Sequence, residues 1–78
     1  MPVVLYTRRG CHLCEAAEDI LAAAGLDVQL VDIDQDADLA AAYGVRIPVV
    51  EVAGEVVLEG RLDERQVAAV LPRLRGQD

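Results

Sequence analysis

Tyr6-Thr7-Arg8-Arg9-Gly10-Cys11-His12-Leu13-Cys14 holds both cysteines of the chain, its only histidine and two of its seven basic residues. The short apolar run Val3-Val4-Leu5 precedes this segment, and a helical pattern begins at Leu13. The apolar run shows no alternation, which is typical of a strand that is buried on both faces. The sequence therefore predicts that Cys11 lies where a buried strand ends and a helix begins.

Cys11 at such a corner is a candidate reactive cysteine. The first N–H groups of a helix have no partner within the helix, and the peptide dipoles leave partial positive charge there. A thiolate is stabilised at that point, so its pKa falls below the free value of about 8.5, and Arg8 and Arg9 act in the same direction. Cys14, one turn later, is placed beneath Cys11 and can close a short disulfide. We therefore predict a dithiol–disulfide exchange site, in which His12 either tunes the pKa of Cys11 or is simply exposed.

Two other roles for the cysteine pair are a zinc clip and an inert place in the core. Structural zinc takes four ligands, so two thiols with His12 beside them would need a second chain to complete the site. Inert buried cysteines do not favour a strand-to-helix corner flanked by arginines. The Cys-x-x-Cys spacing within a βαβ-like pattern favours redox chemistry. The adjacent Arg8-Arg9 pair either receives an anionic group or is solvated.

The composition limits the class of protein. Seventy-eight residues predict one small domain, residues 1–78, with an aliphatic core because Phe and Trp are absent. The net charge of −7 and the lack of lysine argue against nucleic acid and anionic membranes as partners, since both need a basic face. No apolar run approaches the roughly 20 residues that span a bilayer. Met1-Pro2 leads straight into the first strand without a signal peptide, so we expect a cytoplasmic monomer with reduced thiols.

The first half of the chain is predicted to be a β-α-β unit. Strands are expected at residues 3–6 and 27–33, and they are parallel because a helix over residues 11–24 connects them. Gly25 is expected to end that helix. Apolar residues at steps of three and four predict its buried stripe, which comprises Leu13, Ala17, Ile20, Leu21 and Ala24.

The second half is predicted to contain a short helix, a hairpin and a last helix. The acidic run before Tyr43 supplies helix caps and solvated surface rather than a metal site, with Asp34 or Asp36 as the cap; its members are Asp32, Asp34, Asp36 and Asp38. Pro48 opens a hairpin with strands at residues 49–52 and 55–58. Asp63 is expected to cap the last helix together with Gln66, and Pro72 to kink or end it near Leu71. Gly76-Gln77-Asp78 should fray.

The predicted order is β-α-β-α-β-β-α around a four-stranded mixed sheet, an α/β fold. With a thiol pair at the first strand–helix corner, the chain resembles the thioredoxin-fold superfamily, specifically small glutaredoxin-like proteins. Three segments carry the resemblance: the Cys11–Cys14 segment with its approach, Ala42-Tyr43-Gly44-Val45-Arg46-Ile47-Pro48, and Gly60 to Asp63. In place of the family's Pro and aromatic residue between the cysteines, this chain has His12 and Leu13.

The resemblance implies the roles of several residues. Pro48 would be cis and lie against the cysteine pair, and the backbone of Ile47 would pair with an extended substrate or with glutathione. His12 and Asp63 would belong to the site that binds the substrate or glutathione. From their charge, Arg8 or Arg9 would hold a substrate carboxylate.

The activity that we expect is thiol–disulfide exchange on disulfide-containing or glutathionylated proteins, with Cys11 as the nucleophile and Cys14 as the resolving thiol. Glutathione or a thioredoxin reductase would return the electrons, and no metal or tightly bound cofactor is expected. The alternative is a non-catalytic thioredoxin-fold binding module, or a carrier that holds an iron–sulfur cluster between two chains through Cys11 and glutathione.

Overall fold

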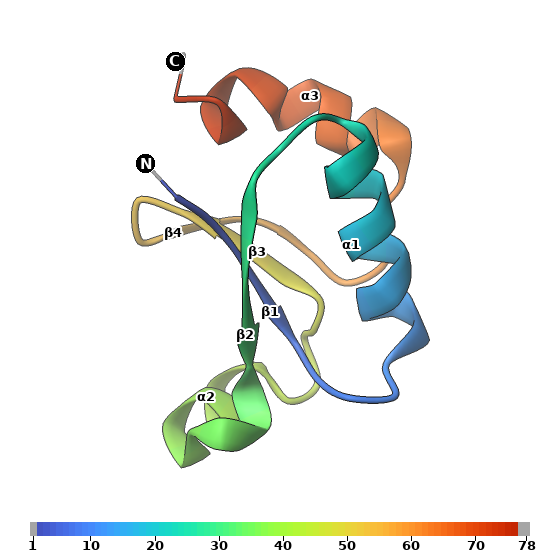
Figure 1. The fold of residues 1–78 in the computed structure, drawn as a ribbon. Coiled ribbons are helices and arrows are strands. Elements are labelled where there is room, and N and C mark those ends of the chain that lie inside the picture. The colour runs from blue at the N-terminus through green and yellow to red at the C-terminus, as the bar shows by residue number, and fades with distance from the viewer. Residues whose placement is uncertain (1, 77–78) are drawn as a thin grey trace.

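The computed structural model describes residues 2–76 as a four-stranded sheet with helices packed against it (Figure 1). The elements, in chain order, are β1 (Val3–Thr7), α1 (His12–Ala23), β2 (Val28–Asp32), the 3-10 turn η1 (Ile33–Gln35), α2 (Ala37–Tyr43), β3 (Val49–Val52), β4 (Glu55–Glu59) and α3 (Glu64–Leu74). This order confirms the predicted β-α-β-α-β-β-α fold. The expectation of fraying at Gln77 and Asp78 lies outside the described residues.

The sheet is mixed, with strand order β2-β1-β3-β4. β1 pairs in parallel with β2, so that Leu5 lies opposite Leu30, and antiparallel with β3, so that Leu5 also lies opposite Val50. Because α1 carries the chain from β1 to its parallel neighbour β2, the carboxyl ends of both strands lie at one edge of the sheet. The loop that follows β1 and the helix α2 gather at that edge (Figure 1).

The core lies between the sheet and the two longer helices, α1 and α3, which cover the same face (Figure 1). Its side chains are small and aliphatic, as the lack of Phe and Trp predicted. Its buried members come from the sheet, both helices and the loop before α3, and they are Val3, Leu5, Ala17, Leu21, Val50, Val52, Leu62, Val67 and Leu74.

Local signals set the ends of the helices as expected. Gly25 has φ of +80°, its N–H donates to the Ala22 carbonyl at 2.9 Å, and the Leu26 N–H donates to the Leu21 carbonyl at 3.3 Å. This pair of bonds is a Schellman termination, in which glycine adopts the left-handed conformation without a Cβ clash. Of the two residues expected to cap α2, Asp36 does so, accepting from the Asp38 and Leu39 N–H groups.

Two predictions about side chains and helix length were wrong. Leu13, expected on the buried stripe of α1, is 39% exposed, because the buried row is Cys14, Ala17 and Leu21, and Leu13 lies about 100° around the helix from Cys14. Of the two effects expected of Pro72, a kink or an end near Leu71, the end is wrong, because α3 continues to Leu74. Leu74 is only 3% exposed, so its burial holds the last turn in place although Pro72 removes one backbone donor.

No helix within residues 2–76 has both the length and the apolar character needed to cross a membrane.

Candidate active site

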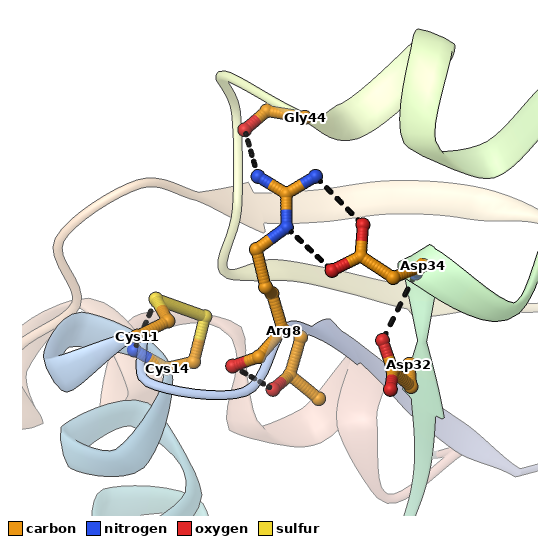
Figure 2. A network of polar contacts seen from close by, with 7 residues as sticks. Arg8, Cys11, Cys14, Asp32, Asp34 and Gly44 are labelled. Carbon is orange, nitrogen blue, oxygen red and sulfur yellow. Dashed lines mark hydrogen bonds and ion pairs between the residues drawn. A yellow bond between two sulfur atoms is a disulfide. The ribbon is translucent and has the colours of Figure 1, made fainter. Parts of the chain in front are cut away.

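Cys11 and Cys14 form a disulfide at the corner between β1 and α1, as predicted (Figure 2). Their Cα atoms are 5.2 Å apart. Cys11 is the N-cap of α1, with an extended backbone, and its Sγ accepts a hydrogen bond from the Cys14 N–H at 3.2 Å. The N–H of Cys11 itself donates to the Arg8 carbonyl at 3.3 Å. The sulfur of Cys11 therefore lies where unpaired N–H groups of the helix favour negative charge.

The two sulfurs differ in access. Cys11 is partly exposed, whereas Cys14 is 2% exposed and faces the core from the first turn of α1. His12 and Leu13, which lie between them in the chain, are both exposed. An incoming disulfide can therefore approach Cys11, while Cys14 is reached only by way of Cys11.

Pro48 is buried, and the Ile47–Pro48 peptide bond is cis, as the resemblance implied. The N–H of Ile47 donates to the Tyr43 carbonyl at 3.1 Å, and the Gly60 N–H donates to the carbonyls of Pro48 and Arg46. The loop before β3 is thus tied to the end of α2 and to the end of β4. Strand-like pairing of a substrate with the backbone of Ile47 stays a prediction. For the Ile47 N–H to donate to a substrate, its hydrogen bond to the Tyr43 carbonyl would first have to break.

Arg8 forms a bidentate ion pair with Asp34 (Figure 2). Its Nε donates to Oδ2 and its Nη2 to Oδ1, each at 2.9 Å, and its Nη1 donates to the Gly44 carbonyl at 3.5 Å. The hydrogen bonds from Arg8 lower the pKa of the Asp34 carboxyl, and the same contact raises the pKa of Arg8. The loop before Cys11 is thereby connected to η1 and to the end of α2.

The other predicted binding residues lie in different settings. Arg9 is exposed and makes no ion pair within residues 2–76. The His12 side chain is 96% exposed, with Nδ1 3.4 Å from Oε2 of Glu15. Asp63 caps α3: its Oδ1 accepts from the Gln66 N–H, and its own N–H donates to Gln66 Oε1, both at 2.8 Å. The predicted capping box is confirmed, whereas the binding roles of these residues stay predictions.

A polar network that joins β1, α2 and β3 was not predicted. Tyr6 donates to Oε1 of Glu51 at 3.1 Å, and Tyr43 donates to Oε2 of the same carboxylate at 3.4 Å. The two rings lie 4.8 Å apart, and the Arg46 guanidinium, 5.1 Å from the Tyr43 ring, is paired with Glu59. Burial and the Glu51 carboxylate raise the pKa of Tyr6 to about 12.

The only signal for this network lies in the strand register. Val4 is opposite Glu51 and Tyr6 is opposite Val49, so Tyr6 and Glu51 are diagonal neighbours on the face of the sheet away from α1 and α3. That relation cannot be read before the pairing of β1 with β3 is known. Tyr6 therefore serves as a hydrogen-bond donor between β1 and β3.

Within residues 2–76, no three or more His, Cys, Asp or Glu side chains are grouped closely enough to hold a metal ion.

The fold and the disulfide together define a thioredoxin-fold protein with a Cys-x-x-Cys pair. Residues 2–72 match the model of the glutaredoxin-like domain (DUF836), and the chain belongs to that family.

Individual proteins are similar to this chain. Glutaredoxin-C7 of Oryza sativa is 34% identical over 79 residues, and the match covers 95% of this chain and 57% of the rice protein. Gene 56 protein of Mycobacterium phage L5 is 46% identical over 37 residues, covering 47% of this chain and 36% of the phage protein. This chain thus spans about half or less of the curated relatives that it matches. Among solved structures, protein XcR50 of X. campestris is 38% identical with a TM-score of 0.82, and the match covers 91% of this chain and 96% of that one.

Proposed function

We propose that this protein is a dithiol disulfide reductase in which Cys11 attacks the substrate and Cys14 resolves the mixed disulfide. The difference in access between the two sulfurs is the observation that carries the proposal: Cys11 is partly exposed, and Cys14 is 2% exposed. Family membership and the shared fold support the same chemistry. The proposed substrates are disulfide-containing or glutathionylated proteins in the cytoplasm, reduced by a monomer without a tightly bound cofactor.

The reaction has two exchange steps. The Cys11 thiolate attacks one sulfur of the substrate disulfide, a sulfur–sulfur bond forms to Cys11, and the other substrate sulfur leaves as a thiolate that takes up a proton. Cys14, once deprotonated, then attacks Sγ of Cys11 and expels the second substrate sulfur. Two electrons pass to the substrate, and the Cys11–Cys14 disulfide that remains is reduced again by glutathione or by a thioredoxin reductase.

Residues around the pair assist at defined atoms. The N–H of Cys14, which already donates to Sγ of Cys11 at 3.2 Å, would stabilise the thiolate of the reduced protein. The free N–H groups at the start of α1 would add to this stabilisation of the thiolate. Cys14 can act although it is buried, because Cys11, which it attacks, lies only three residues away at the start of the same helix.

Replacing each cysteine separately tests the roles. Cys11→Ser is expected to abolish reduction of every disulfide. Cys14→Ser is expected to keep the reduction of a glutathione mixed disulfide, because a second glutathione can resolve it, and to accumulate a covalent adduct with a protein disulfide. Mass spectrometry of the adduct identifies the linked cysteine. An active Cys11→Ser protein with an inactive Cys14→Ser protein would reverse the assignment.

The electron donor is identified by parallel coupled assays. One assay supplies glutathione with glutathione reductase, and the other supplies thioredoxin reductase; NADPH consumption is followed at equal protein concentration. The reductase proposal would be ruled out if neither donor supported turnover and the chemically reduced protein also failed to reduce a disulfide in a single turnover.

A further inference from the structure

Arg8, which pairs with Asp34, lies three residues before the proposed nucleophile, Cys11. The carbonyl of Arg8 accepts the N–H of Cys11, so the two residues are joined through the backbone at the corner where the substrate disulfide would arrive. Figure 2 shows the Arg8 side chain extending from this loop to Asp34 and Gly44. Arg8 and Arg9 are the arginines nearest to Cys11 in the sequence, so they are the groups with which a carboxylate of a substrate bound to Cys11 would pair.

The carboxylate of Asp34 already pairs with the Arg8 guanidinium in the way that a ligand carboxylate would. Both of its oxygens are engaged at 2.9 Å, by Nε and Nη2, which is the paired geometry of arginine with a carboxylate. The remaining nitrogen, Nη1, donates to the Gly44 carbonyl. An incoming carboxylate therefore has to displace Asp34 before it can use Arg8.

The displacement is sterically and energetically accessible. The side chains of Arg8 and Asp34 are 37% and 48% exposed, so water can reach both partners and screens the pair. Asp34 belongs to the short turn η1, and its own N–H is held by Asp32 Oδ1 at 2.9 Å, so the backbone stays in place when the carboxylate swings away.

We propose that Asp34 is a specificity-determining residue: an internal carboxylate that competes with substrate carboxylates for Arg8. The protein thereby disfavours small disulfides that carry carboxylates, such as glutathione mixed disulfides, relative to uncharged disulfides and to protein disulfides without an acidic neighbour. The inference rests on the proposed function for its meaning in turnover, but the competition for Arg8 is measurable in the absence of turnover.

Binding is tested first, with a probe that cannot react. S-methylglutathione carries both carboxylates of glutathione and no free thiol, and its dissociation constant from the oxidised protein is measured by NMR titration. Asp34→Asn is expected to bind it about two- to fivefold more tightly, in the upper part of the range set by loss of one exposed ion pair. Asp34→Ala, which leaves no side-chain acceptor for Arg8, is expected to show at least the same gain and also serves if the first variant is unstable.

Asp38→Asn is the matched control, because it removes the same charge from the same acidic segment, and within residues 2–76 Asp38 is in no ion pair. Asp38→Asn is expected to change the dissociation constant less than twofold. Equal gains in the two variants would mean that net charge alone governs affinity, and no gain with either Asp34 variant would mean that Asp34 does not compete; each result overturns the proposal. Adding Arg8→Gln to Asp34→Asn is expected to remove the gain, and a gain that survives in the double variant also overturns it.

Turnover is tested separately. In single-turnover experiments, chemically reduced protein is mixed with the mixed disulfide of glutathione and 2-mercaptoethanol, or with the uncharged bis(2-hydroxyethyl) disulfide. Asp34→Asn is expected to raise the ratio of the two rate constants, charged over uncharged, about two- to fivefold. A purely structural role of Asp34 would change both rate constants together and leave the ratio in place, which refutes the specificity role. Failure of all proteins to reduce either disulfide would instead refute the proposed function, while the binding comparison would still decide the competition for Arg8.

Discussion

Asp63→Ala is expected to destabilise the fold by removing the cap of α3. The Oδ1 atom of Asp63 accepts the N–H of Gln66 at 2.8 Å, and the same residue donates its N–H to Gln66 Oε1. Loss of an N-cap acceptor costs about 1 kcal/mol, within a range of roughly 0.5–2. The backbone N–H of residue 63 remains in the variant, so the second bond is not added to this cost.

The expected loss is large enough to measure. For a domain of this size, about 1 kcal/mol corresponds to a fall in Tm of about 4–8 °C. The free energy of unfolding is obtained from urea titrations followed by circular dichroism, with the disulfide intact in every protein. Asp63→Asn is the matched control: it keeps an acceptor oxygen at the same place, and its stability should lie within about 0.5 kcal/mol of the parent protein.

Two outcomes would contradict the capping argument. If Asp63→Asn were destabilised as much as Asp63→Ala, the charge of Asp63 and not its acceptor oxygen would be the stabilising feature. If neither variant changed the urea midpoint, the capping box would contribute nothing to the stability of α3. A role in holding glutathione is separable, because Asp63→Asn would then weaken S-methylglutathione binding while the urea midpoint stayed in place.

Three further predictions concern the core and the ionisable groups. Leu21→Ala should cost about 3 kcal/mol in urea titrations, because Leu21 is 0% exposed, whereas Leu30→Ala, at a site that is 49% exposed, should cost less than about 1; equal costs would contradict the described core. Tyr6, whose pKa is raised to about 12 from 10.0, should give an absorbance step at 295 nm that Tyr6→Phe lacks and that Glu51→Gln moves to lower pH. Since this pKa is raised in the folded state, its contribution to stability is complete below about pH 10 and is lost as the pH rises toward 12, which alkaline urea titrations of Tyr6→Phe and the parent would check. The hydrogen bonds from Arg8 lower the pKa of Asp34, so the ion pair stabilises the folded protein at pH values above the ordinary carboxyl pKa, and this stability is lost as the pH falls through the pKa of the folded state. If Asp34→Asn still differed in stability from the parent protein below that pKa, this reasoning would be refuted.

The sequence alone was sufficient for features that depend on a few neighbouring residues. The Cys11 corner, the Gly25 termination and the capping box of Asp63 and Gln66 all involve partners within five positions, and the residue that defines each of them was predicted. The element order followed from apolar periodicity, and the family resemblance led from that order to the cis peptide bond before Pro48.

Tertiary structure decided the contacts between distant segments. Arg8 meets Asp34 across 26 positions and Tyr6 meets Glu51 across 45, and neither pair has a spacing that sequence reasoning can recognise. The exposure of Leu13 likewise depends on which row of α1 faces the sheet. The physical reason is that strand order and register determine which side chains share a face, and a shift of one residue would turn each strand's side chains to the opposite side.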